Sequence, residues 1–232
     1  MSEDLDPPSR RELVVLSLAV LLLIDRVGRP WSFRQIFPAF EAEPQVTTLI
    51  ELLWWCGCCL AFFWGLPAYW LNRRGQSWRE AVGAFPRGPA LLLYLGMYFT
   101  VLPLILHYFR DARFVETYPF YRYGEGHLEL VVLWELAYGC MFFSLEFFFR
   151  GFLLRQLCPV WGWGAIWFSA IPYCLIHYNK PLPEMLGALP AGLVLGYASW
   201  RSGSIWGGLA VHLGVAYTMD TVQLLYKSGI IQ

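Results

Sequence analysis

The segment from Leu130 to Leu157 reads LVVLWELAYGCMFFSLEFFFRGFLLRQL, almost wholly apolar and without a proline. An apolar run of about 20 residues is long enough to cross a bilayer as a helix, so we predict one long membrane helix here. The run nevertheless contains Glu135, Glu146 and Arg150. A charge at mid-bilayer costs roughly 2.5 kcal/mol or more, so these charges must pair, face a polar cavity or take part in chemistry. Glu146 and Arg150 are four residues apart, on one helical face, and can pair.

The composition of the whole chain is that of a membrane protein. Apolar residues make up 57% of its 232 residues, charged residues only 15%, and the mean hydropathy is +0.46. With 17 basic and 17 acidic side chains the formal net charge is zero, and no basic face indicates nucleic acid. We expect a cytoplasmic N-terminal tail, residues 1–12, followed by a single transmembrane domain, residues 13–232. No feature of the sequence indicates an oligomeric state.

Apolar runs along the chain predict an all-α fold, a polytopic transmembrane helix bundle of about seven spans. The expected spans are residues 13–24, 48–71, 90–108, 130–157, 161–177, 182–200 and 204–226. A turn is expected at Cys158 and Pro159. The loop after the second span carries Arg73, Arg74 and two further arginines, which favours the cytoplasm for this loop and for the N-terminus. We expect a multi-pass protein of the cell inner membrane.

Ionisable and imidazole side chains are few in the later spans. They are Glu135, Glu146, Arg150, His177, His212 and Asp220. At about 1.5 Å per residue from the cytoplasmic helix ends, Glu146, His177 and His212 lie roughly 16, 21 and 13 Å deep. We therefore expect these three to converge in one water-accessible cavity. Glu135 is roughly 16 Å from Glu146 along the helix, and Asp220 is two turns beyond His212, too far for direct partnership.

A carboxylate and two imidazoles in a membrane cavity have two chemical uses. Glu146 can act as a general base that activates water, with a histidine steadying the water or the oxyanion. Alternatively, Glu146, His177 and His212 can hold zinc, which lowers the pKa of its bound water. Arg150 fits both, because an opposite charge keeps Glu146 ionised. A purely structural interpretation also stands, in which a buried ion pair and hydrogen-bonded histidines tie the helices together.

Three motifs resemble a known family. They are EFFFRGFL from Glu146, YCLIH from Tyr173 to His177, and the run GYASWRSGSIWGGLAVH that ends at His212. In order and spacing they resemble the motifs of the CAAX protease and bacteriocin-processing family of intramembrane glutamic endopeptidases, which includes type II CAAX prenyl proteases. The resemblance covers residues 129 to about 220, the protease-like motif region.

The resemblance implies a multi-helix membrane fold with a cytoplasm-accessible cavity, which cuts a membrane protein or peptide near its terminus or membrane segment. By motif, Glu146 and Arg150 correspond to the second glutamate and the arginine of E-E-x-x-x-R. His177 corresponds to the histidine of F-x-x-x-H, with Tyr173 in place of the phenylalanine. Glu146, Arg150, His177 and His212 are thus the expected catalytic residues, and no cofactor is implied, zinc being the alternative.

Two positions depart from the family pattern. The first glutamate, which usually activates water, falls on Leu145, and the asparagine of H-x-x-x-N falls on Ala216. Loss of one oxyanion donor costs about 3 kcal/mol in other enzymes. The expected function is therefore an intramembrane endopeptidase in which Glu146 activates water and both histidines assist. The alternative is a noncatalytic membrane scaffold or bacteriocin-immunity-type protein. A transporter has only the buried charges in its favour, because no repeat of the chain is evident.

Overall fold

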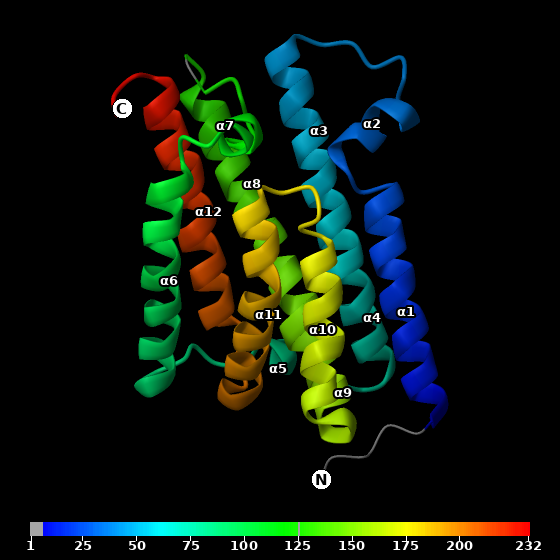
Figure 1. Cartoon of the computed structure of the whole chain (residues 1–232). Coiled ribbons are helices and arrows are strands. Elements are labelled where there is room, and N and C mark those ends of the chain that lie inside the picture. Colours follow the sequence, from blue (N-terminus) through cyan, green and yellow to red (C-terminus); the bar gives the residue numbers. More distant parts are fainter. Residues whose placement is uncertain (1–6, 125) are drawn as a thin grey trace.

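The computed structural model describes residues 7–124 and 126–232, and every regular element in these ranges is helical. Figure 1 shows the long helices standing side by side as a bundle. The first six residues of the expected tail lie outside the described ranges. Helix α1 (Pro7–Arg26) begins well before the expected border at residue 12, because the polar residues before the apolar run continue the same helix.

The described apolar segments form long helical runs. These are α3 (Pro44–Cys59) with η1 (Leu60–Gly65) and α4 (Leu66–Arg73), α6 (Pro89–Tyr108), α8 (Leu128–Glu146) with η2 (Phe147–Leu153) and α9 (Leu154–Trp161), α10 (Trp163–Leu175), α11 (Leu182–Ser202) and α12 (Trp206–Lys227). Among the described residues, three runs are long and apolar enough to cross a membrane: Pro44–Arg73, Pro89–Tyr108 and Leu128–Trp161. The all-helical membrane architecture is confirmed, and the expected count of about seven spans stays a prediction.

The organising helix is longer than expected. The turn predicted at Cys158 and Pro159 is wrong, because both residues lie inside α9, which continues to Trp161. The helix ends instead at Gly162, whose φ of 49° is accessible to glycine at little cost. Helix α10 follows at once and ends at Leu175, so His177 lies just beyond the helix, in the turn that leads to α11.

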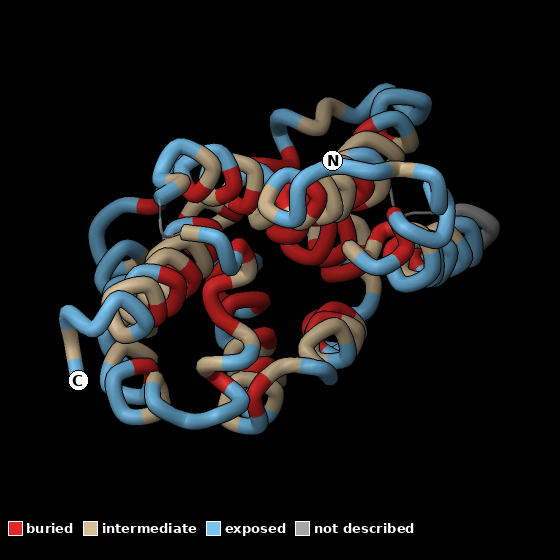
Figure 2. Tube along the Cα trace, turned by 90° about the horizontal axis from the view of Figure 1, so that it is seen from above, coloured by how far each residue is buried: buried red, intermediate tan, exposed pale blue. Residues whose placement is uncertain are grey.

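Three short helices lie in the connecting segments: α2 (Pro30–Ile36), α5 (Trp78–Val82) and α7 (Ala112–Thr117). Figure 1 places α5 near the end of the bundle where the described chain begins, whereas α2, α7 and the C-terminus lie at the opposite end. Figure 2, a view along the bundle, shows the buried residues turned toward the interior and the exposed residues on the outside. The arginine-rich loop after α4 therefore lies at the α5 end.

An apolar cavity of about 250 Å³ lies between the helices. It extends to the end opposite the arginine-rich loop, where Arg29, Tyr108, Phe114 and Lys180 contribute to its lining. This arrangement brings two expectations into conflict. A cytoplasmic arginine-rich loop and a cytoplasm-accessible cavity require opposite orientations of the bundle in the membrane, because the two features lie at opposite ends.

Two cysteine substitutions distinguish these orientations. Gln76→Cys reports on the arginine-rich loop, and Asn179→Cys reports on the turn between α10 and α11 at the cavity end. Because positive loops are retained in the cytoplasm, we expect an impermeant thiol reagent outside intact cells to label Asn179→Cys and not Gln76→Cys. The wild-type chain is the background control, because its cysteines all lie in helices. Labelling of Gln76→Cys alone would place the cavity end in the cytoplasm.

Candidate functional site

The site is built on the junction between α8 and η2. Glu146 is the last residue of α8, and η2 is a stretch of π-helix within an otherwise continuous helical run. Such π-turns are rare and occur frequently at functional sites. The surroundings are dry, because Phe147, Phe148 and Phe149 are all completely buried. Arg150, in the middle of η2, is therefore held in an apolar environment where its charge needs a partner.

The partner of Arg150 is Glu146, as the spacing predicted. Arg150 Nη1 lies 3.1 Å from Glu146 Oε1, and both side chains are almost completely buried. The same carboxylate oxygen lies 2.6 Å from His212 Nδ1, on α12. Since a carboxylate can only accept a proton, attraction at this distance requires a proton on Nδ1. Two of the expected residues from distant parts of the chain, Glu146 and His212, are thus in direct contact.

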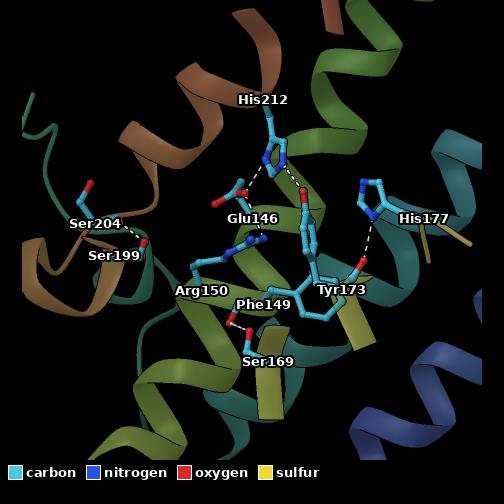
Figure 3. A network of polar contacts seen from close by, with 9 residues as sticks. All are labelled: Glu146, Phe149, Arg150, Ser169, Tyr173, His177, Ser199, Ser204 and His212. Carbon is cyan, nitrogen blue, oxygen red and sulfur yellow. Dashed lines mark hydrogen bonds and ion pairs between the residues drawn. The ribbon is translucent and has the colours of Figure 1, made fainter. Parts of the chain in front are cut away.

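Tyr173 connects the polar groups, a role that the motif did not reveal. Its hydroxyl lies 2.6 Å from His212 Nε2, and its ring lies 4.3 Å from the Arg150 guanidinium carbon, within range of a cation–π interaction. Figure 3 shows Tyr173 between His212 on one side and His177 on the other. A phenylalanine at this position would keep the ring and lose the hydrogen bond. The hydroxyl was therefore the sequence signal that could have identified the role.

His177 joins the network through the backbone rather than through Glu146. Its Nδ1 lies 2.7 Å from the carbonyl oxygen of Tyr173. A carbonyl only accepts, so Nδ1 carries the proton and donates it, and Nε2 of the neutral ring keeps its lone pair. His177 also lines the cavity. The structure therefore holds His177 in the tautomer that has a basic nitrogen available.

The cavity wall separates the expected site residues into two sets. Tyr173, His177 and His212 line the cavity, whereas Glu146 and Arg150 are not among its lining residues. The two positions that depart from the family pattern, Leu145 and Ala216, do line it. At about 250 Å³ the cavity is far larger than the roughly 10–15 Å³ that one water needs. Water thus has space beside His177, while Glu146 does not line that space and its Oε1 contacts both Arg150 and His212.

The described residues contain no group of three His, Cys, Asp or Glu side chains that could hold a metal ion. Glu146, His177 and His212 are therefore not brought together as such a group, and the zinc alternative stays a prediction. The other two acidic residues of the later spans meet each other: Glu135 of α8 and Asp220 of α12 are in side-chain contact. They lie in a separate part of the bundle, as their distances along the helices predicted.

A glycine on α12, Gly208, allows this helix to approach the Glu146 carboxylate closely. Gly208 packs so near it that a Cβ at this position would overlap the carboxylate oxygen. We expect Gly208→Ala to displace Glu146 from His212 and to lower the free energy of unfolding by about 1–3 kcal/mol, typical of overpacking. Thermal unfolding of the detergent-purified protein measures this effect. Gly96→Ala is the matched control, because a Cβ there meets no atom within 4 Å. Equal stability of the two variants would contradict the close packing.

Comparisons with known proteins bear on residues 128–218. This segment matches the model of a family described as Type II CAAX prenyl endopeptidase Rce1-like. Comparison with curated proteins and with solved structures gave no match. The matched segment begins at α8 and ends within α12, so it contains every residue of the network in Figure 3. The three motifs and the match agree: residues 128–218 are similar to the Rce1-like type II CAAX prenyl endopeptidases of the CAAX protease and bacteriocin-processing family.

Proposed function

We propose that this protein is an intramembrane endopeptidase in which His177 activates the attacking water. At the level of the family, the Rce1-like region implies CAAX-type proteolysis in a membrane. The observation that supports the finer assignment is the position of His177, which lines the cavity while its Nδ1–H donates to the carbonyl oxygen of Tyr173 and leaves the Nε2 lone pair available. The substrate is a membrane-associated protein or peptide, and the proposed site is in the cell inner membrane.

The proposed reaction is a general base-catalysed hydrolysis that needs no metal. His177 Nε2 takes a proton from water as the water oxygen attacks the carbonyl carbon of the peptide bond. When His212 carries both ring protons, its Nε2–H donates to the Tyr173 oxygen, and the Tyr173 O–H on the cavity wall can donate to the resulting oxyanion. The protonated ring of His177 then gives its proton to the amide nitrogen, the C–N bond breaks, and a carboxylic acid and an amine are released.

In this proposal Glu146 is a positioning residue. The sequence favoured Glu146 as the base, but its Oε1 contacts both Arg150 and His212, and Glu146 does not line the cavity. The carboxylate orients the His212 ring by fixing the proton on Nδ1, as the buried aspartate does in serine protease triads. Arg150 balances the charge of Glu146, so the pair can stay ionised in an apolar environment.

A second candidate function is noncatalytic binding of a peptide or membrane protein on the same fold. Leu145 and Ala216 both line the cavity, so apolar groups stand where the family has its usual water-activating glutamate and its asparagine. Such a wall would bind an apolar segment and lack two of the groups that support hydrolysis. Leu145 is decisive here because its side chain, unlike that of Glu146, faces the space available to water.

The first test removes the proposed base. We expect His177→Ala to reduce proteolysis by roughly 10²–10⁴-fold, the usual contribution of a general base, with little change in folding because His177 lies outside the helix. The measurement is mass spectrometry of new protein N-termini in membranes from cells that express each variant at matched levels. His107→Ala, at the end of α6, is the control and should retain activity. Cleavage by wild type that survives His177→Ala would remove His177 from the mechanism.

The second test restores the family's carboxylate in the cavity. In a working enzyme based on His177, Leu145→Glu should reduce activity or stability, because it places another charge in apolar surroundings. In a protein that has lost catalysis, wild type should be inactive, and Leu145→Glu together with Ala216→Asn should produce new N-termini. Leu136→Glu, on the outer face of the same helix, controls for the added charge. Absence of cleavage by wild type with recovery in the double variant would establish the noncatalytic function.

A further inference from the structure

A second cleft lies outside the candidate site, between α1 and α4 at the arginine-rich end of the bundle. Its lining changes in character along the helices. Leu16 and Leu66 lie farthest from the end, Tyr69 and Trp70 come next, and Glu12, Arg73 and Arg74 lie nearest the end. Residues 66 to 73 span about 10 Å at the helical rise. Apolar, aromatic and charged groups thus follow one another in the order of a bilayer's acyl, interfacial and headgroup layers.

The charged residues that line this cleft within the described part of the chain are Glu12, Arg73 and Arg74. Arg74 is fixed in place by Glu12, with Nη2 2.5 Å from Oε2, and by Trp70, with its guanidinium carbon 4.4 Å from the ring centroid. Arg73 is exposed, and its side chain makes no hydrogen bond or ion pair with the residues in the described ranges 7–124 and 126–232. Among the described residues that line the cleft, two arginines thus stand beside one glutamate, and Arg73 is the exposed cation at its rim.

We propose that this cleft binds an anionic phospholipid, with its phosphate at Arg73 and Arg74 and an acyl chain along Leu16 and Leu66. Guanidinium groups match phosphate oxygens with two parallel hydrogen bonds, so a pair of arginines suits this headgroup. A basic pocket between membrane helices is a common form of anionic lipid site. The apolar inner part favours a lipid over a free anion, because a free anion would contact only the rim. The site is independent of the proposed proteolysis, since it lies at the end opposite the cavity.

The experiment measures lipid retained by the purified full chain. Native mass spectrometry after exchange into neutral detergent compares phosphatidylglycerol with phosphatidylcholine, added at equal concentration. We expect preferential retention of phosphatidylglycerol. Arg73→Gln should weaken that retention about fivefold, because one arginine near an anionic surface contributes about 1 kcal/mol. Arg87→Gln is the matched control, an exposed arginine of the same connecting segment that does not line the cleft. Size-exclusion profiles establish that both variants remain folded.

Two further arms separate a lipid from other ligands. Inorganic phosphate should not displace phosphatidylglycerol, whereas it would do so if the rim alone bound the anion. Leu16→Asn should weaken retention of phosphatidylglycerol if the acyl chain lies along this residue. Equal retention of the two lipids, no effect of Arg73→Gln, or displacement by inorganic phosphate would each overturn the proposal. Proteolytic activity is not a readout in any arm, so the result stands apart from the fate of the proposed function.

Discussion

The buried ion pair between Glu146 and Arg150 is the constraint on which the rest of the site depends. Both charges lie in apolar surroundings, where loss of one partner would leave the other uncompensated and cost about 3–5 kcal/mol. The other polar groups are arranged around this pair. His212 uses the same carboxylate oxygen, Tyr173 stacks its ring on Arg150 and bonds to His212, and Gly208 brings α12 close enough for the contact.

Adjacent residues of helix α8, Leu145 and Glu146, have different surroundings. Successive helical residues differ by about 100° in direction, so Glu146 faces the protein interior while Leu145 faces the cavity. Of the two adjacent glutamates of the family motif, this chain keeps only Glu146, which does not line the cavity. The position that does line the cavity is occupied by Leu145. In the mechanism we propose, hydrolysis relies on a group that does reach the cavity, and His177 lines it with its Nδ1 proton donated to a carbonyl oxygen.

The two ends of the bundle differ in the side chains that they expose and in the cavities that they contain. One end carries the arginine-rich loop and the cleft between α1 and α4, where aromatic and basic side chains gather. The opposite end carries the cavity, which is lined mostly by apolar side chains and reaches the level of Arg29 and Lys180. A bound lipid at the first end would hold the bundle at a defined depth without obstructing the second. Anchoring and substrate access would then be served by separate surfaces.

The sequence by itself determined the helices, the buried ion pair and the membrane class, because apolar length and the four-residue spacing of Glu146 and Arg150 are local properties. Estimated depth also placed His212 near Glu146. The sequence misplaced the end of the long α8–α9 helix at Pro159, because the helix ends where Gly162 adopts a positive φ. Only the tertiary structure decided that Glu146 faces away from water, that Tyr173 links the histidines, and that the cavity extends away from the arginine-rich loop. These depend on how far each helix is rotated about its axis, which packing against distant helices sets and hydropathy does not record.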